Sequence, residues 1–231
     1  MAGNEPSSTM RQYLLRIFLP GLLITAAPVL CGQGTIVYYN PTDIRIFAEH
    51  VPYELDLDQN GAVDFRVIKG GSSGFAAYGI GNNASLAVPE QPPDIGALIT
   101  PIPAGEYIGP SLTPPNTWFE TYSFEPVPGI SFTVPATFHA CTTAWCIGAF
   151  HDVTAYWGVQ FEIAGNFHYG WVQVATQGGI REGGTILDWA YNSIPGQSIL
   201  AGQVPEPGTI ALFVVGSGLL WWRAKRIHRQ N

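Results

Sequence analysis

Short stretches in which apolar and polar residues alternate recur through the middle of this chain, and they constrain its fold more than any other feature. Alternation with a period of two is typical of strands with one buried face, whereas an amphipathic helix repeats every 3.6 residues. Many of the 27 Gly and 19 Pro residues separate these stretches, as turn residues do. The predicted strands are residues 35–39, 44–47, 53–57, 63–68, 131–134, 155–163, 167–174 and 185–191.

These strands predict an all-β fold, an antiparallel β-sandwich or jelly-roll-like single domain. The tripeptide Ala164-Gly165-Asn166 separates two long strands and is expected to form a hairpin turn. The stretch from 70 to 117 is rich in Gly, Pro and Ser, and we expect long loops there with one or two strands. A signal helix and a C-terminal transmembrane helix are expected to flank the domain.

Residues 1–32 are predicted to be a signal peptide. Arg11 and Arg16 precede an apolar stretch, 17–27, that ends in small residues, which is the pattern of a secretory signal. Signal peptidase and the general secretion machinery are therefore expected partners. Residues 33–203 are then the extracytoplasmic domain.

The predicted domain is strongly acidic. Between residues 33 and 203 there are four Lys or Arg and fifteen Asp or Glu residues. Such a charge balance disfavours nucleic acid and anionic lipid as partners and favours cations. We therefore expect no nucleic-acid partner.

Cys141 and Cys146 are expected to form a small structural disulfide loop, because export favours oxidised cysteines. The C-x4-C spacing and the absence of a strand–helix pattern around it disfavour a redox site. Two cysteines alone do not make a metal site.

One stretch between two predicted strands has the composition of a metal-binding loop. Oxygen ligands at positions 1, 3, 5, 7 and 9 with Gly61 at position 6 suit Ca²⁺. Position 12 is Val67, so the bidentate Glu of an EF-hand is missing, and Glu54 or a residue from elsewhere in the fold would have to complete the shell. The alternative is an Asn-Gly hairpin turn with solvated acids. The predicted ligands of this structural calcium site are Asp56, Asp58, Asn60, the Ala62 carbonyl and Asp64.

The C-terminal residues 204–231 combine three features in a fixed order. Two prolines first hold the chain extended, because they prevent helix formation. Residues 208–222 then supply a short apolar stretch, somewhat less than the roughly 20 residues that a bilayer crossing needs. A basic end follows, which should stay cytoplasmic. The extended motif is Val204, Pro205, Glu206 and Pro207, and the basic residues are Arg223, Lys225, Arg226 and Arg229.

This order of motif, short apolar helix and basic end resembles the PEP-CTERM sorting signal of bacterial exosortase substrates. A stretch from 156 to 203, with Tyr169-Gly170-Trp171-Val172 and Trp189-Ala190-Tyr191, is also similar to segments that recur in PEP-CTERM proteins. The resemblance implies cleavage by an exosortase at or near Pro-Glu-Pro, after transient insertion in the inner membrane. It implies a final location at the cell surface or in the extracellular matrix.

No catalytic residues are predicted, and the chain is expected not to be an enzyme. His151 and Asp152 are adjacent and would point to opposite faces of a strand, and no nucleophile elbow, zinc-protease helix or phosphate loop is present. The predicted function is a structural or adhesive β-domain of a surface or matrix protein. The alternative is a calcium-dependent, lectin-like module that binds exopolysaccharide, which would place its tryptophan rings on the surface.

Overall fold

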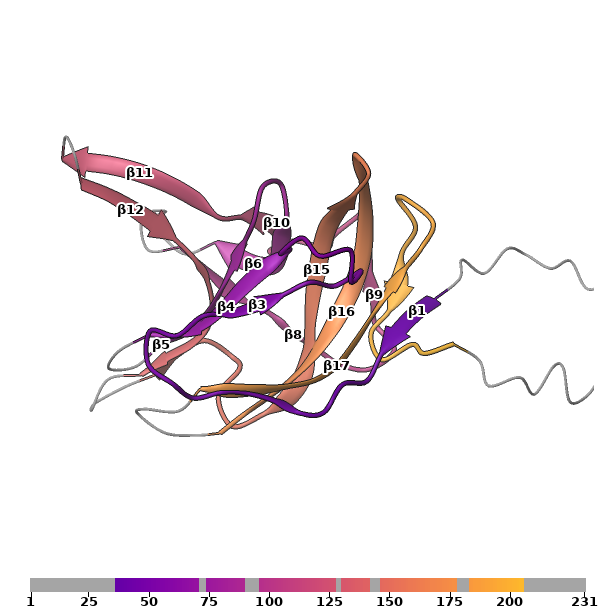
Figure 1. Cartoon of the computed structure of the whole chain (residues 1–231), viewed down its shortest axis with the longest axis horizontal. Helices are drawn as coiled ribbons and strands as arrows, with labels where there is room; N and C mark the ends of the chain where they lie inside the picture. The colour runs from indigo at the N-terminus through magenta and orange to yellow at the C-terminus, as the bar shows by residue number, and fades with distance from the viewer. Residues whose placement is uncertain are drawn as a thin grey trace, which may run out of the picture. The chain divides into compact units, whose positions relative to one another are not determined.

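The computed structural model describes residues 36–70, 74–89, 96–127, 130–141, 146–177 and 183–205. These residues belong to one compact unit of the chain and form strands joined by loops (Figure 1). The predicted signal peptide and the C-terminal apolar helix lie outside the described residues. Within the described part, no helix has the length and apolarity to cross a membrane.

The strands of the first half of the described chain are short. They are β1 (Ile36–Tyr39), β2 (Ile44–Ile46), β3 (Tyr53–Leu55), β4 (Phe65–Lys69), β5 (Gly74–Gly79), β6 (Ala84–Pro89), β7 (Ala97–Ile99), β8 (Pro101–Ile102) and β9 (Tyr107–Ile108).

The second half contains the longest strands, β15 to β17. Its strands are β10 (Thr117–Glu120), β11 (Tyr122–Val127), β12 (Ile130–Val134), β13 (Ala136–Cys141), β14 (Cys146–Ile147), β15 (Thr154–Ile163), β16 (Asn166–Thr176), β17 (Gly184–Asn192) and β18 (Ile199–Leu200).

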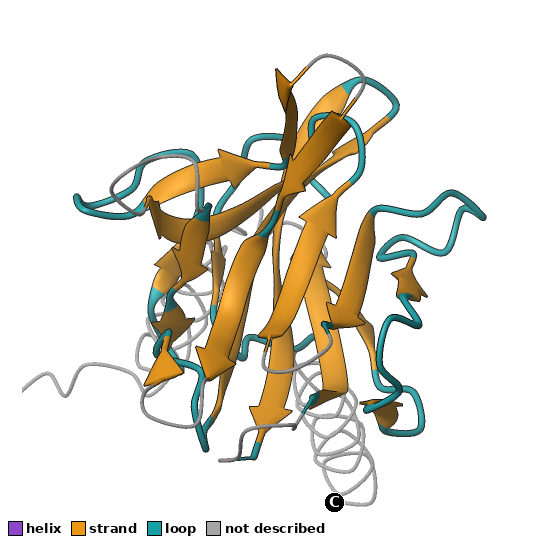
Figure 2. Cartoon of the chain, turned by 90° about the vertical axis from the view of Figure 1, so that its left-hand side faces the viewer, coloured by secondary structure: helices purple, strands orange, loops and turns teal. Residues whose placement is uncertain are grey.

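Fourteen of these strands form one curled, mixed sheet (Figure 2). Its main order is β1-β17-β16-β15-β6-β7-β13-β5-β4-β3, with β2, β8, β10 and β14 paired at its sides. Two small sheets, β11-β12 and β9-β18, complete the described part. The prediction of a purely antiparallel sheet is wrong in one place, because β7 and β13 pair in parallel. The all-β class is confirmed.

The curl of the sheet encloses the larger hydrophobic core. Strands distant in the sheet order meet there: the ring of Phe65 on β4 lies 5.0 Å from that of Trp157 on β15, and the ring of Phe138 on β13 lies 5.2 Å from it. All three side chains are fully buried. Aromatic side chains bury the most apolar area per residue, so these contacts hold β4 and β13 against β15 across the core.

A second core covers the opposite face of the long strands. Along β16, Val172 and Val174 face the larger core, whereas Tyr169 and Trp171 face the second. Ile108 and Ile199 of the β9-β18 pair cover Trp171 from outside. The central strands are therefore buried on both faces. A bulge in β17 opposite Gln173 and Val174 shifts the register by one residue, so that Val174 pairs with Ile186.

The sequence predicted the long hairpin correctly. β15 and β16 pair from Thr154↔Ala175 to Ile163↔Asn166, and Ala164 and Gly165 form the two-residue turn with positive φ angles. Each of the eight predicted strands has a counterpart. The expectation of one or two strands within residues 70–117 was too low, because β5 to β9 and the start of β10 lie there.

Replacing Phe138 with Ala should lower the free energy of unfolding by about 3–5 kcal/mol, because it opens a cavity among Phe75, Phe150 and Trp157. Urea unfolding followed by tryptophan fluorescence measures this. Phe167→Ala is the control, since that side chain is 39% exposed and its loss should change the free energy by no more than about 0.5 kcal/mol. Equal effects of the two changes would contradict the burial of Phe138 in the larger core.

Candidate functional site

The loop between β3 and β4 is the predicted calcium loop, and it is tied to the core at both ends. The backbone N–H of Asp64 donates to the Leu55 carbonyl at 2.9 Å. Leu57 within the loop is 1% exposed, and the indole N–H of Trp189 donates to its carbonyl at 3.0 Å. Positive φ angles at Gln59 and Gly61 turn the chain between these anchors. The loop is thus a fixed element of the fold.

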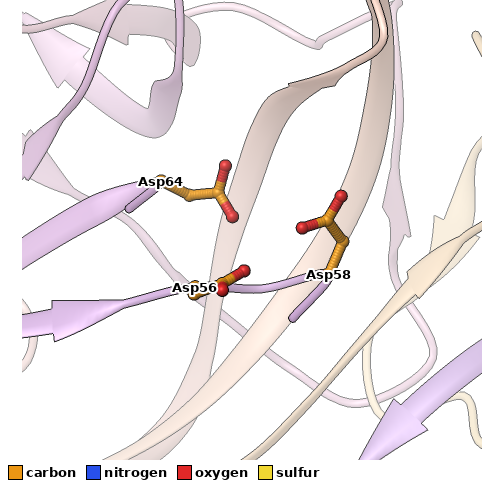
Figure 3. A group of neighbouring side chains, drawn as sticks. All are labelled: Asp56, Asp58 and Asp64. Atoms are coloured by element: carbon orange, nitrogen blue, oxygen red, sulfur yellow. The ribbon is translucent and has the colours of Figure 1, made fainter. Parts of the chain in front are cut away.

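The three aspartates of this loop converge (Figure 3). One carboxylate oxygen of each of Asp56, Asp58 and Asp64 lies within 4.8 Å of the others. Asp56 and Asp58 are half-buried, and Asp64 is buried. Carboxylate oxygens gathered in this way are hard ligands of the kind that Ca²⁺ prefers, so the triad could hold a metal ion.

Backbone and side-chain donors already hold the two outer carboxylates in place. Asp56 accepts hydrogen bonds from the N–H groups of Asn60 at 3.2 Å and Gly61 at 2.7 Å. Asp58 accepts from the Asn60 N–H at 3.2 Å and from the Asn60 side-chain amide at 2.9 Å. These bonds orient the oxygens and partly offset the repulsion between them.

Asp64 is the buried member of the triad, with an exposed fraction of 5%. It accepts a hydrogen bond from the Leu57 N–H at 2.7 Å and one from the Asn83 side-chain amide at 3.2 Å. Burial, together with the charges of Asp58 and Asp56, raises the pKa of Asp64 from its ordinary value of 3.8 to about 6, although the two hydrogen bonds oppose the rise. Ionised Asp64 is therefore costly unless a cation lies beside it.

The negative charge of the loop also acts on a neighbouring tyrosine. Burial is the largest cause that raises the pKa of Tyr191 to about 12, and the interactions with Tyr39, Asp58 and Asp64 contribute to the same rise. Tyr191 therefore stays a neutral hydrogen-bond donor at any physiological pH. The loop and this end of β17 share one electrostatic environment.

The other predicted ligands take different places. The Asn60 side-chain oxygen accepts the Ala62 N–H at 2.7 Å, which forms a local turn. Ala62 is an exposed residue of the same loop. Glu54 does not join the triad; it forms an exposed ion pair with Arg66 at 3.2 Å.

Asn83 is the residue of this site that the sequence analysis missed. It lies in the turn before β6 and is 5% exposed. Its side-chain amide donates to the Asp64 carbonyl at 3.1 Å, and its oxygen accepts the Glu162 N–H at 3.0 Å. One asparagine thus connects the loop to β15, and only the fold brings it there.

The tryptophans whose burial is described do not form a surface platform. Trp157, Trp171 and Trp189 have exposed fractions of 0%, 1% and 4%. Trp118 is partly buried and packs against the second core, and Trp145 lies outside the described residues. The described tryptophan side chains therefore belong to the two cores.

Two histidines of the described part, His139 and His168, are buried in the fold. His168 is buried, with Nδ1 at 2.9 Å from the Asn192 carbonyl, which fixes its ring. His139 is also buried, and its ring lies 6.2 Å from that of His151. Cys146 is disulfide-bonded, and the backbone register places Cys141 directly opposite it.

The first two residues of the C-terminal motif follow a segment that is bonded to the second core. The Trp171 indole N–H donates to the Gln203 carbonyl at 3.2 Å, and the Gln203 side chain accepts the Leu200 N–H at 3.1 Å. Val204 and Pro205 follow and are exposed. The remaining residues of the motif and of the basic end, Glu206, Pro207, Arg223, Lys225, Arg226 and Arg229, lie outside the described residues.

No family model matches this chain, and no curated protein or solved structure matches it.

Without metal, Asp64 should make stability depend on pH. Because its pKa is raised in the folded state, protonated Asp64 contributes to the free energy of unfolding. This contribution is fully present below about pH 3.8 and is lost as the pH rises through about 6. Between about pH 4 and pH 7 in EDTA, the free energy of unfolding of the wild type should fall by on the order of 2 kcal/mol more than that of Asp64→Asn. Denaturant unfolding across this range measures the difference, and parallel curves would contradict the burial of an ionisable Asp64.

Proposed function

We propose that this chain is an exported protein of the cell surface or extracellular matrix that is processed by an exosortase. The three parts of the C-terminal cassette, in their order along the sequence, carry the proposal: Val204-Pro205-Glu206-Pro207, a short apolar stretch and a basic end. The apolar stretch inserts transiently in the inner membrane and presents the motif, and cleavage releases the domain. Signal peptidase and the general secretion machinery act before this step.

The contacts around Gln203 support cleavage at this place in the chain. Ala201, two residues earlier, is 2% exposed, and its N–H donates to the Glu106 carbonyl at 2.8 Å. Val204 is 42% exposed. Because the described packing runs up to Gln203 and the chain is exposed directly after it, a cut within the motif removes none of the described core.

The β-domain has a structural or adhesive role in this proposal. Its buried tryptophans favour that role over a surface of stacked rings that binds sugars. We further propose that the curled sheet is a β-sandwich with jelly-roll-like order. The contacts between Phe65, Phe138 and Trp157 across the larger core support two packed layers.

The loop formed by residues 56–64 is proposed to bind a structural Ca²⁺ ion. The convergence of three carboxylates, one of them buried, supports this. In an extracellular medium the ion would offset the repulsion among the carboxylates and the cost of burying ionised Asp64. Asn60 and the Ala62 carbonyl are the proposed further ligands.

Calcium should raise the melting temperature of the purified chain, because it binds the folded loop and not the unfolded one. At a calcium concentration 100 times the dissociation constant, the free energy of unfolding should rise by about 2.7 kcal/mol. The double variant Asp56→Asn/Asp58→Asn should lose both this gain and the heat of binding in titration calorimetry, while its turn bonds can persist. Asp43→Asn, an exposed change outside the loop, should keep both. A wild type that neither binds calcium nor gains stability would refute the site.

Changing Glu206 to Ala should block sorting. In an exosortase-bearing host, the wild-type protein should be found shortened in the surface fraction, and Glu206→Ala should stay at full length in the inner membrane. Fractionation followed by immunoblotting distinguishes the two. Glu162→Ala, in a strand distant in sequence from the motif, is the control and should be sorted normally. Full-length wild-type protein retained in the membrane would mean that the tail is a permanent anchor.

A further inference from the structure

A cleft of about 400 Å³ opens beside the second core, at the loop that contains β9. Its inner wall is apolar and includes Leu86 and Ile102, which are 3% and 4% exposed. Polar side chains line the cleft as well, among them Glu106 and Asn116. It shares no residue with the Asp56–Asp64 loop. Clefts with an apolar wall and a few polar groups are the usual form of small-molecule sites.

Tyr107 is the most exposed large apolar side chain of the described part, at 78%, and it lines this cleft. The next residue, Ile108, is fully buried in the second core. Alternation along β9 therefore turns Tyr107 outward while Ile108 holds the strand down. The tyrosine ring is presented to solvent on a fixed backbone.

Backbone pairing fixes the positions of Tyr107 and Glu106. Leu200 on β18 pairs with Tyr107. The Ala201 N–H donates to the Glu106 carbonyl at 2.8 Å, and the Gly105 N–H donates to the Ala201 carbonyl at 2.9 Å. Ligand binding therefore need not order this backbone, which lowers the entropic cost of binding.

Asn116 is held as well. Its side-chain oxygen accepts the hydroxyl of Thr100 at 2.8 Å, and its backbone N–H donates to the Thr113 carbonyl at 3.2 Å. The first bond orients the amide plane and directs its NH₂ group away from Thr100. The cleft thus combines an oriented amide, a carboxylate, hydroxyl groups and an exposed aromatic ring.

This combination suits a ligand that has one apolar face and a rim of hydroxyl groups. A pyranose ring has both: its C–H face can lie on Tyr107, and its hydroxyls can donate to Glu106 and accept from Asn116. Among the described residues that line the cleft, Glu106 alone is charged. A negative charge there, on an acidic domain, disfavours uronic acids and sulfated sugars.

We propose that this cleft binds a neutral hexopyranose unit of a surface polysaccharide, without calcium. The inference rests on the proposed function, in which the domain acts at the surface or in the matrix, and it supplies the adhesive contact. The site is a single-ring cleft around Tyr107, and the buried tryptophans take no part in it.

Affinity electrophoresis of the full chain in a non-ionic detergent tests this, in native gels that contain dextran, laminarin, mannan or alginate. At least one of the three neutral polymers should retard the protein, and alginate, a polyuronate, should not. Tyr107→Ala should raise the dissociation constant about tenfold or more, whereas Tyr107→Phe keeps the ring and should bind as the wild type does. Tyr122→Ala, an exposed tyrosine outside the cleft, should bind normally.

Each other result overturns the proposal. Equal migration in all four gels, retardation by alginate, or binding that Tyr107→Ala leaves intact would refute the cleft, and a loss of binding counts as support when the melting temperature of Tyr107→Ala is unchanged. Binding that EDTA or Asp56→Asn/Asp58→Asn abolishes would move the sugar site to the calcium loop. The assay uses purified protein and no exosortase, so its failure is distinct from a failure of sorting.

Discussion

The whole described structure depends on burying β15, β16 and β17 on both faces. Trp157 and Val172 belong to the core enclosed by the curled sheet, while Trp171 lies in the second core beneath β9 and β18. A short β-domain with one covered face would expose a row of large aromatic rings, and burying both faces avoids this. The second core packs so closely on β15 that Gly158 has no room for a side chain. A Cβ there would lie 2.9 Å from the Ile102 side chain and 3.0 Å from that of Leu86.

The acidic loop and the core are parts of one arrangement. Trp189 is buried and its indole N–H needs an acceptor, and the Leu57 carbonyl inside the loop provides it at 3.0 Å. Asp64 and Asn83 then connect the loop to the turn before β6 and to β15. The fold thereby holds three carboxylates close together, which costs free energy in the absence of a cation. This cost is why the loop is proposed as a calcium site and not as a simple turn.

The sequence predicted the elements with strong alternation and failed where the pattern was weak. The hairpin of β15 and β16 was clear because its long strands alternate and Ala164-Gly165 is a recognisable turn. The strands β5 to β9 were largely missed, since small residues such as Ala76, Ala77, Ala84 and Ala87 carry little hydrophobic pattern. The parallel pairing of β7 with β13 is a long-range contact that no local signal reveals. At the loop, spacing alone indicated the three aspartates, but Asn83 comes from the turn before β6, and only tertiary structure identifies it.

The second core also connects the fold to the proposed fate of the protein. Trp171 holds Gln203, and the chain becomes exposed at Val204, immediately before Glu206 and Pro207. The domain should therefore keep its fold when its C-terminal cassette is lost. Top-down mass spectrometry of the protein recovered from the surface of its native host tests this claim most directly. The account predicts a chain that lacks residues 208–231 and ends at or near the Pro-Glu-Pro motif. A surface protein that still carries the apolar stretch and Arg229 would contradict it.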